Sequence, residues 1–435
     1  MDHDKKKCQV VIVGGGAAGL ELAIRLVKNF HREKNIQVTL VDESLRYIWK
    51  PLYNEVAAGT VDIAQDEINY ITYAHRKGLN FVLGSFCGLD KQLKQITISP
   101  VLDDEKKVII PQRQIPYDYL VIAVGSVSNS FGIPGVKENC YFLDKLVQAE
   151  RFQRNFLYEI LAFIQTHEFD QKELNVVIVG GGATGVELAA ELKYALSKAI
   201  HYGSKPSGLV ENLKISIVEG AKRILPNLSE EISVKVTKEL REMGIVVIPN
   251  QRVTKALATG LETASELFLT ADVMVWSAGI KAPDFLAELN LEVNSLNQLI
   301  VKQNLLTSND YIFALGDCAA CMNLKDNTLV PPRAQAARQQ AAYLAKSFKM
   351  MFKGQPVPDF VYKDYGSLVS LSRKNVVGNL MGKVGNFFIE GKLARLSYLF
   401  LHKEHQATLF GIWKTFLLTV SNVFTRKIKS GIKLH

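Results

Sequence analysis

The chain has 435 residues, enough for roughly three domains of about 100–200 residues each. A hydrophobic content of 48% with 22% charged residues excludes intrinsic disorder, and five irregularly spaced cysteines exclude a disulfide scaffold and favour a reducing compartment. The N-terminal residues MDHDKKKCQ lead directly into an apolar strand, without the apolar core and cleavage site of a signal peptide. We therefore expect no export through a cleaved signal.

The net charge of +9 is concentrated at the C-terminal end of the chain. Residues 341–435 contain 15 Lys or Arg against 4 Asp or Glu, whereas the other 340 residues contain 37 basic and 39 acidic side chains. A basic tail of this kind binds either nucleic acid or an anionic membrane surface. Its longest uncharged run, residues 415–425, has eleven residues, short of the about 20 that a spanning helix needs. We expect no transmembrane segment.

The first predicted elements form one copy of an internal repeat. Residues 10–23 read VVIVGGGAAGLELA and residues 176–189 read VVIVGGGATGVELA, with twelve of fourteen positions identical at an offset of 166. Each copy predicts a buried strand, a G-x-G-x-x-G turn and a helix. In this turn the first glycine allows the tight bend, the second lets the backbone approach a pyrophosphate, and the third lets helix and strand pack closely. The sequence therefore predicts two dinucleotide-binding sites.

Each copy is followed by a second predicted strand that ends in an acidic residue. Residues 37–41 (QVTLV) lead to Asp42, and residues 214–218 (KISIV) lead to Glu219. A carboxylate at this place hydrogen-bonds a ribose hydroxyl, and at Glu219 it would repel a 2′-phosphate, which favours NAD(H) over NADP(H). The alternative is a solvated carboxylate at a strand end.

Two further buried strands are predicted outside the repeats. Residues 115–126 (IPYDYLVIAVGS) contain a turn, a strand and a glycine, and residues 307–317 (TSNDYIFALGD) contain a strand that ends in Gly316 and Asp317. Taken alone, each is an ordinary buried strand of a parallel sheet. Their order fits a flavin domain interrupted by a nicotinamide domain, a pairing that two dinucleotides imply because hydride passes directly between those two rings.

A helix rich in alanine and glutamine is predicted over residues 332–343. Gln335 and Gln339 are four residues apart and so share one face of this helix. Neutral amides at the mouth of an apolar slot suit quinone carbonyls, which need hydrogen-bond donors without a buried charge. The alternative is a solvated glutamine face, and the residues alone favour that alternative.

The last predicted element is an amphipathic helix in the basic tail, residues 393–435. Its apolar residues recur at spacings of three and four and are followed by cations: Leu409, Trp413, Phe416, Leu417, Val420 and Phe424, then Arg426, Lys427, Lys429 and Lys433. Such a helix lies in the membrane interface with its cations at anionic headgroups. A nucleic-acid tail needs no such apolar stripe, whereas a dimer interface or a core helix does.

Together these motifs resemble the two-dinucleotide flavoprotein disulfide-reductase superfamily, and within it the type II NADH:quinone oxidoreductases of bacterial respiration. GGGAAG at 14–19, YDYLVIAVGS at 117–126 and FALGDCA at 313–319 are similar to the FAD signatures, and GGGATGVELAAEL at 180–192 is similar to the NADH signature. WKPLYNEVAAG at 49–59 resembles the segment beside the flavin, and PPRAQAARQQAAYL at 331–344 contains the A-Q-x-A-x-Q quinone motif. The resemblance covers essentially the whole chain.

The resemblance implies a role for each matching residue. FAD would be held by Gly14, Gly16, Ala17, Ala18, Gly19, Asp42, Glu43, Lys50, Pro51, Ala123, Gly125, Gly316, Asp317 and Gln335. NADH would be held by Gly180, Gly182, Thr184, Gly185, Glu187, Glu219 and Gly279. The implied catalytic residues are Glu187, close to the nicotinamide and the flavin, and Gln335 and Gln339, which would face quinone.

Glu187 also has a simpler interpretation, and at one other position this chain departs from the family. An acid in the first turn of a helix is favoured by the helix dipole alone, and Glu21, the counterpart of Glu187 in the first repeat, has no implied chemistry. Part of the family has a histidine where this chain has Arg338. Because an arginine cannot exchange a proton near pH 7, we expect no proton relay at that residue.

The cysteines bear on other members of the same superfamily. No cysteine lies between Asp42 and Thr60 or between Cys140 and Cys318, which excludes both arrangements of a redox disulfide. The one C-x-x-C, Cys318 to Cys321, is either a reactive pair, with thiol pKa values lowered at a helix start, or two small buried residues, and no Cys or His motif completes a zinc site. Cys140 with Cys318 or Cys321 resembles the separated pair of sulfide:quinone oxidoreductases, but that family leaves the second fingerprint unexplained.

We therefore expect an α/β fold with two Rossmann-like domains, the NADH domain inserted into the FAD domain. The expected boundaries are 1–130 and 291–345 for FAD, with the quinone motif in the second part, 131–290 for NADH, and 346–435 for a helical region that associates with the membrane. The resemblance implies FAD-dependent, non-proton-pumping electron transfer from NADH to ubiquinone or menaquinone, without a metal. The enzyme would be a homodimer, peripheral on the cytoplasmic face of the inner (cell) membrane, and would bind no nucleic acid. The alternatives are a sulfide:quinone oxidoreductase and an NADH-sensing flavoprotein that switches a partner interaction.

Overall fold

The computed structural model describes residues 7–31, 36–166, 173–199, 212–371, 375–382 and 385–425. The chain forms two compact units, each assembled from separate segments. The first unit contains residues 1–49, 67–127 and 280–364, and the second contains residues 50–66, 128–279 and 365–435. The short strands β12 (Val127–Ser128) and β20 (Ile280–Lys281) mark where the chain leaves the first unit and returns to it.

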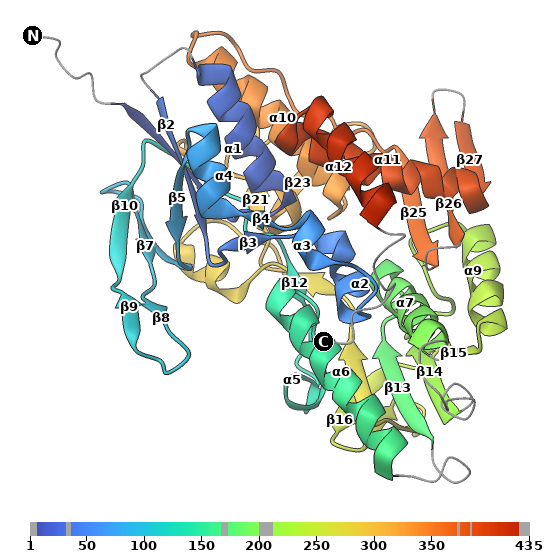
Figure 1. The fold of residues 1–435 in the computed structure, drawn as a ribbon. Helices are drawn as coiled ribbons and strands as arrows, with labels where there is room; N and C mark the ends of the chain where they lie inside the picture. The colour runs from blue at the N-terminus through green and yellow to red at the C-terminus, as the bar shows by residue number, and fades with distance from the viewer. Residues whose placement is uncertain are drawn as a thin grey trace, which may run out of the picture. The chain divides into compact units, whose positions relative to one another are not determined.

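The first unit is built on a five-stranded parallel sheet with the order β22-β11-β1-β2-β5. Its strands are β1 (Cys8–Val13), β2 (Ile36–Asp42), β5 (Asn80–Leu83), β11 (Tyr119–Ile122) and β22 (Ile312–Ala314). The helices of this unit are α1 (Ala17–Phe30), α4 (Tyr70–Lys77) and α10 (Ala334–Met351), with the 3₁₀ turns η3 (Asp284–Leu289) and η4 (Gly316–Cys318). Helices α1 and α10 lie side by side (Figure 1).

Strand β1 lies at the centre of this sheet because its residues are apolar on both faces. Val10, Val11, Ile12 and Val13 are at most 3% exposed and pair with β2 on one side and β11 on the other. Such continuous apolar runs are typical of strands that are covered on both faces. The strands predicted within residues 115–126 and 307–317 are confirmed as β11 and β22, next to β1 and at the sheet edge.

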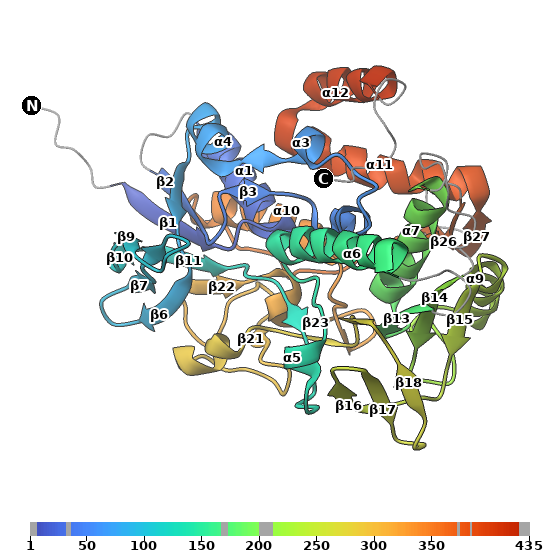
Figure 2. The same cartoon turned by 60° about the horizontal axis from the view of Figure 1, so that its bottom comes forward.

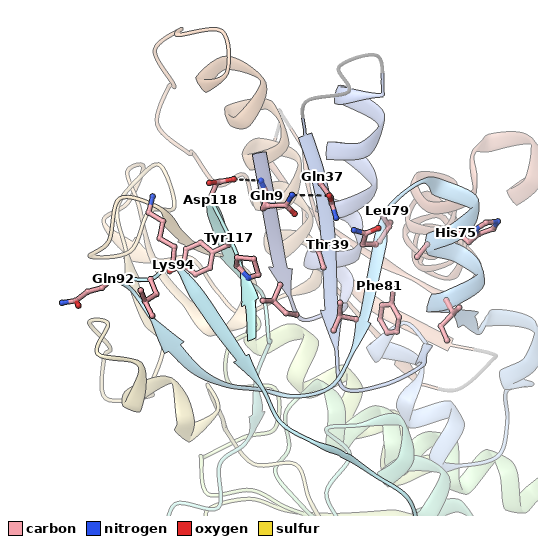
Figure 3. A pocket seen from close by; sticks show the side chains of 17 residues that line it. Gln9, Gln37, Thr39, His75, Leu79, Phe81, Gln92, Lys94, Tyr117 and Asp118 are labelled. Carbon is pink, nitrogen blue, oxygen red and sulfur yellow. Dashed lines mark hydrogen bonds between the residues drawn. The ribbon is translucent and has the colours of Figure 1, made fainter. Parts of the chain in front are cut away.

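Shorter antiparallel strands complete the first unit. They are β3 (Arg46–Tyr47), β4 (Ile68–Asn69), β6 (Phe86–Asp90), β7 (Gln95–Ile98), β8 (Val101–Leu102), β9 (Val108–Ile110), β10 (Arg113–Pro116), β21 (Leu299–Val301), β23 (Ala319–Asn323) and β24 (Thr328–Leu329), with β21 running parallel to β23. A broad hollow of about 940 Å³ lies along the ends of β1, β2 and β5 and the β7–β10 pair (Figure 3). Its polar groups bond one another: Gln9 donates from its backbone N–H to Asp118 and from its side chain to Gln37.

The second unit contains the second repeat in a four-stranded parallel sheet with the order β15-β14-β13-β19. Its strands are β13 (Leu174–Val179), β14 (Leu213–Val218), β15 (Ile245–Ile248) and β19 (Val273–Trp276). Helices α7 (Ala183–Ala199) and α9 (Glu230–Glu242) pack on this sheet (Figure 2). Both predicted strand–turn–helix repeats are therefore confirmed, each at the centre of its own sheet.

The remaining elements before the C-terminal region also belong to the second unit. They are η1 (Lys50–Leu52), α2 (Tyr53–Ala57), α3 (Ile63–Asp66), α5 (Val136–Asn139), α6 (Leu146–Thr166), β16 (Val253–Leu257), β17 (Gly260–Thr263) and β18 (Phe268–Thr270). Helix α2 packs against both α6 and α7, and this contact brings the segment 50–66 to the face of the helix that follows the second fingerprint.

The C-terminal region corrects two expectations. It is not wholly helical, because β25 (Gly366–Leu371), β26 (Asn375–Gly382) and β27 (Gly385–Glu390) form an antiparallel sheet that packs on α11 (Gly391–Phe410). The predicted apolar stripe is not one helix face, because Gly411 at φ +90 separates α11 from α12 (Ile412–Thr425). Leu409 belongs to α11 and is 1% exposed, whereas Trp413 on α12 is 81% exposed.

Helix α12 carries an exposed apolar surface, which comprises Ile412, Trp413, Phe416, Leu417 and Val420. The side chain of Phe424 and the cations Arg426, Lys427, Lys429 and Lys433 lie outside the described residues. Among the residues that the structure describes, no helix combines the length and apolar character needed to cross a membrane.

Candidate dinucleotide and quinone sites

The glycines of the first fingerprint have the distinct roles that their spacing predicts. A Cβ at Gly14, whose φ is +97, would lie 2.4 Å from the carbonyl oxygen of Ala123, and one at Gly19 would lie 1.9 Å from the carbonyl oxygen of Gly14. Both positions are therefore closed to a side chain by backbone. At Gly16, the residue before α1, a Cβ would meet no atom of the described residues within 4 Å.

The second fingerprint repeats this geometry in the second unit. A Cβ at Gly180 would lie 2.7 Å from the backbone nitrogen of Ala278, and one at Gly185 would lie 2.0 Å from the carbonyl oxygen of Gly180. At Gly182 the corresponding space is again open among the described residues. Thr184 is exposed in the first turn of α7, and Gly279, at φ +65, packs under the ring of Phe131.

Each strand-end acid is bonded to the glycine turn of its own repeat. Asp42 accepts from the backbone N–H of Gly15 at 2.6 Å and from that of Ser44 at 2.8 Å. Glu219 accepts from the backbone N–H of Gly181 at 2.6 Å and from that of Ala221 at 2.8 Å. These matching bonds fix both carboxylates beside the turns, so neither is a freely solvated strand end.

Gly316 and Asp317 lie beside the first fingerprint. Gly316, at φ +78, is close to the first turn of α1, since a Cβ there would be 3.6 Å from the Cβ of Ala18. The Ser126 hydroxyl donates to the Asp317 carboxylate at 2.8 Å, and the Gln298 side chain donates to the Asp317 carbonyl at 2.9 Å. The backbone N–H of Gly316 donates to Gln340, a residue that the sequence analysis missed because no motif marks it.

The other predicted FAD residues are spread over both units. Ala17 follows Gly16 at the start of α1, and Gly125, at φ +73, ends the segment after β11 with open space around its Cβ direction in the described part of the chain. Glu43 is exposed and accepts from the Ser85 hydroxyl at 3.2 Å. Lys50 and Pro51 form the start of the segment 50–66, which belongs to the second unit.

Glu187 has the most unusual environment of the predicted catalytic residues. Its carboxylate accepts from the Asn54 side-chain amide and from the backbone N–H of Ser370, each at 3.1 Å. The side chain keeps some contact with solvent, but burial by the surrounding protein raises its pKa from 4.5 to about 8. The two hydrogen bonds lower the pKa, whereas the nearby carboxylates of Glu55 and Glu191 raise it further. Glu187 is therefore poised to hold a proton near neutral pH.

Glu191, one turn further along α7, adds a second buried carboxylate on this face. It is 3% exposed and accepts from the buried Thr60 hydroxyl at 2.7 Å. The segment 50–66 thus supplies one hydrogen-bond donor to each of two acids on α7. The sequence marks this segment only as a motif, and neither contact can be predicted from it because the partners are more than 130 residues apart.

Gln335 and Gln339 lie on one face of α10, as their spacing predicts, and both contact residues 363–364. Gln335 donates to the Asp364 carboxylate at 3.2 Å, which also accepts from Arg333 at 3.3 Å. Gln339 donates to the backbone carbonyl of Lys363 at 2.7 Å and accepts from its N–H at 3.0 Å. The amide of Gln339 is thus engaged on both sides, whereas Gln335 holds a position beside an ion pair.

Arg338 points to the other side of α10 and binds Glu21. The Nε of Arg338 lies 3.2 Å from the Glu21 carboxylate, and Arg25 donates to the same carboxylate at 2.7 Å. Glu21 is fully buried, so the two arginines compensate its charge. This contact ties α10 to α1 and gives Arg338 a structural partner.

The thiols have the environment of buried residues, which favours the second of the two alternatives for Cys318 and Cys321, two small buried residues. Cys318 ends η4 and Cys321 lies in β23, so the pair does not begin a helix. Burial raises the pKa of Cys318 to about 12 and that of Cys321 to about 11. Burial also raises the pKa of Cys140 to about 12. The described part of the chain contains no group of three or more His, Cys, Asp or Glu placed to hold a metal ion.

Both fingerprint turns fit a dinucleotide pyrophosphate. The space in front of Gly16 and Gly182 is the place that a Cβ would fill and that a phosphate can enter. Gly16 provides no side chain to cap the amides of α1, and the first turn of neither α1 nor α7 carries an acidic side chain that would compete for these amides. The carboxylates of Asp42 and Glu219 lie at the far side of each turn, where a ribose would follow.

Comparison with known proteins agrees with this geometry. The family model described as pyridine nucleotide-disulphide oxidoreductase matches residues 8–341, which places the chain in this class. A type II NADH:quinone oxidoreductase from Haemophilus influenzae is 41% identical over 98% of this chain and 99% of its own, and one from Staphylococcus saprophyticus is 27% identical over 91% and 93%. The chain therefore belongs to the family of type II NADH:quinone oxidoreductases.

Solved structures share the same fold. The structure of NDH2 from Plasmodium falciparum in complex with NADH superimposes with a TM-score of 0.84 at 20% identity, over 99% of this chain and all of that chain. The sulfide:quinone oxidoreductase of Aquifex aeolicus superimposes with a TM-score of 0.71 at 17% identity, over 93% and 92%. The fold is thus common to both activities, and the sequence relationship is what separates them.

Proposed function

We infer that this chain transfers electrons from NADH to a quinone. The observation that carries the inference is the repeated acid–glycine bond, Asp42 to Gly15 and Glu219 to Gly181, in a chain that is 41% identical to a type II NADH:quinone oxidoreductase. Two dinucleotides need two such turns. When bound, FAD supplies the two-electron chemistry that links NADH oxidation to quinone reduction.

We assign FAD to the first unit and NADH to the second. Gly14, Gly16, Gly19 and Asp42 would hold the FAD pyrophosphate and ribose, with Asp317 at the ribityl chain. Gly180, Gly182, Gly185 and Glu219 would hold NADH, and the Glu219 carboxylate disfavours a 2′-phosphate at the same place. Each carboxylate is already fixed by two backbone N–H groups, so it needs little reorganisation to meet a ribose hydroxyl.

Glu187 is assigned as the residue that holds a proton for the reaction. NADH oxidation coupled to quinone reduction takes up one proton for each turnover, and a carboxyl group with a pKa of about 8 is protonated at neutral pH. Asn54 and Ser370 orient its carboxylate through one hydrogen bond each. The fixed geometry favours proton transfer at one defined oxygen.

Gln335 is assigned to the quinone carbonyl. Its side-chain nitrogen donates to Asp364 at 3.2 Å, which orients the amide, and a neutral amide suits a quinone carbonyl because it brings no buried charge. Gln339 supports this arrangement by joining α10 to the backbone of Lys363. The choice between ubiquinone and menaquinone and the absence of proton pumping stay predictions.

We further propose that the enzyme is peripheral on the cytoplasmic face of the cell membrane and forms a homodimer. Support for membrane contact comes from α12, where Ile412 is 79% and Trp413 is 81% exposed on one helix that also bears Lys414. Aromatic and aliphatic side chains beside a cation are typical of helices that lie in the membrane interface. The alternative is that the same apolar surface packs against a second copy of the chain. A surface that contacts the membrane should make the protein bind vesicles, whereas a surface buried in a dimer should not.

The test of the proposed function is anaerobic double mixing of the purified, flavin-loaded protein. NADH is added first and a short-chain quinone second, while the flavin absorbance is followed. Rapid bleaching by NADH and rapid recovery with quinone would establish both half-reactions. Bleaching by sulfide, with none by NADH, would move the assignment to a sulfide:quinone oxidoreductase, and slow recovery even with lipid present would favour an NADH sensor.

A further inference from the structure

Gln340 is a buried polar residue to which neither the sequence motifs nor the proposed function assign a role. It lies in α10 next to Gln339, but its side chain is 2% exposed and contacts Gly316, whereas Gln339 contacts Lys363. Its Oε1 accepts a hydrogen bond from the backbone N–H of Gly316 at 2.7 Å. A buried acceptor is favourable when it has a donor, so this contact accounts for the amide oxygen of Gln340.

This hydrogen bond acts on the dipeptide Gly316–Asp317, in which the glycine backbone can adopt several conformations. Gly316 has φ +78, in the left-handed region, and lies between α1 and α10, where a Cβ would be 3.6 Å from the Cβ of Ala18 and 3.9 Å from that of Ala337. Because glycine has no side chain, its backbone can leave this conformation without a steric barrier. The hydrogen bond to Gln340 holds the Leu315–Gly316 peptide plane, from which the chain enters Asp317 through the glycine.

Two other side chains complete the arrangement. Ser126 donates to the Asp317 carboxylate at 2.8 Å, and Gln298 donates to the Asp317 carbonyl at 2.9 Å. Three segments distant in the sequence therefore fix the dipeptide, and Gln340 is the one that fixes its first peptide group. We propose that Gln340 is a positioning residue for FAD, which orients Asp317 beside the first turn of α1. This inference rests on the assignment of FAD to the first unit.

The variant that isolates the acceptor is Gln340→Met, which keeps the length and volume of the side chain but leaves the Gly316 N–H without a partner. We expect FAD to bind about tenfold more weakly, the factor expected when a buried donor loses its acceptor. Gln340→Glu keeps an acceptor oxygen and should retain FAD better than Gln340→Met. Gln340→Asn keeps the amide but is one methylene too short, and it carries the test if Gln340→Met does not fold.

The measurement is release of FAD from the holoprotein on heating, followed by flavin fluorescence, together with unfolding followed by tryptophan fluorescence. For Gln340→Met and Gln340→Asn we expect FAD to leave at a lower temperature than in the wild type, before the protein unfolds. Equal shifts of release and unfolding would overturn the proposal, because they indicate a purely structural role. Release as in the wild type would overturn it as well.

Gln339→Met is the matched control on the neighbouring residue of the same helix. Because Gln339 contacts the backbone of Lys363 and not Gly316, this variant should release FAD as the wild type does. Early release of FAD from Gln339→Met to the same extent would overturn the proposal, since any change in α10 would then have the effect. If the wild-type protein itself binds no FAD, the proposed function fails, an outcome that is distinct from wild-type-like behaviour of the Gln340 variants.

Discussion

Glu21 and Glu187 occupy the same position of the internal repeat, 166 residues apart, but their carboxylates have opposite kinds of partner. Glu21 is bound by the guanidinium groups of Arg25 and Arg338. Glu187 is bound by two neutral donors, Asn54 and the backbone of Ser370, and faces two further acids. One repeat position thus serves packing in the first unit and, in our proposal, proton chemistry in the second.

The pH dependence of stability should report on Glu187. Because its pKa is raised from 4.5 to about 8 in the folded protein, its stabilising contribution is full below pH 4.5 and is lost as the pH rises through about 8. We expect Glu187→Gln to flatten the fall in stability between pH 5.5 and 8.5, by at most about 1.4 kcal/mol per pH unit. Urea unfolding of the nicotinamide-free protein across this range measures the change.

A matched control for this experiment is Glu242→Gln on α9. The Glu242 side chain is 64% exposed, so its charge stays in solvent in both states and the pH slope should not change. If Glu187→Gln keeps the wild-type slope, Glu187 is already ionised throughout the range and its assignment as a proton-holding residue is wrong.

Near neutral pH, substitution of Glu21 should lower the free energy of unfolding more than substitution of Glu187 does. Glu21→Gln removes the buried carboxylate that binds Arg338, itself only 18% exposed, and we expect a loss of about 3 kcal/mol in the free energy of unfolding. The double variant Glu21→Gln/Arg338→Gln should recover part of this loss. Denaturant unfolding of the wild type, Glu21→Gln, Arg338→Gln and the double variant tests it, and strictly additive effects would argue against a direct interaction.

Two alanine substitutions in the second fingerprint should separate ligand binding from folding. Gly182→Ala places a methyl group in space that no described atom fills within 4 Å, so stability should change by less than about 0.5 kcal/mol while NADH binding weakens. Gly185→Ala drives a Cβ to 2.0 Å from a carbonyl oxygen and should destabilise by about 1–3 kcal/mol. Thermal unfolding and NADH titration of both variants measure these effects. If Gly182→Ala binds NADH as tightly as the wild type does, the assignment of the pyrophosphate to this turn is wrong.

The nicotinamide preference should depend on Glu219. Glu219→Gln removes the charge that repels a 2′-phosphate while keeping a polar side chain, so the preference for NADH over NADPH should fall by about tenfold. The ratio of kcat/KM values for the two nucleotides measures this change. Asp42→Asn, at the equivalent place in the first unit, should weaken FAD retention and leave the nucleotide ratio unchanged. A shift of that ratio in Asp42→Asn alone would reverse the assignment of the two units.

Membrane attachment should depend on α12 and not on α11. Truncation after Gly411 removes α12 but keeps α11, whose buried Gln406 donates to Asp66 at 2.9 Å, and should abolish sedimentation with phosphatidylglycerol vesicles. Activity with a short-chain quinone should persist. Trp413→Glu/Phe416→Glu in the full chain separates apolar contact from charge: if this variant still sediments and the truncated protein does not, the terminal cations provide the attachment.

The features that can be predicted from the amino-acid sequence are those that depend on residues close together along the chain. The strand, the glycine turn and the helix of both fingerprints follow from the apolar run and the glycine spacing, and β11, β22 and the shared face of Gln335 and Gln339 follow from local periodicity. Within such a stretch the backbone conformation brings the residues together, so their order is enough to predict their arrangement. The break at Gly411 is also local, but a stripe of apolar residues that continues across it conceals the change of helix.

The chemical difference between similar residues depends on contacts between segments that are far apart along the chain. Glu21 and Glu187 lie in nearly identical sequences, and their partners Arg338, Asn54 and Ser370 come from segments far along the chain. The same holds for Gln340, which contacts Gly316, and for Cys318 and Cys321, whose burial raises their pKa values and so decides between the two alternatives. A pKa depends on the solvation and charges within a few ångströms of the group, and these are fixed by how distant segments pack.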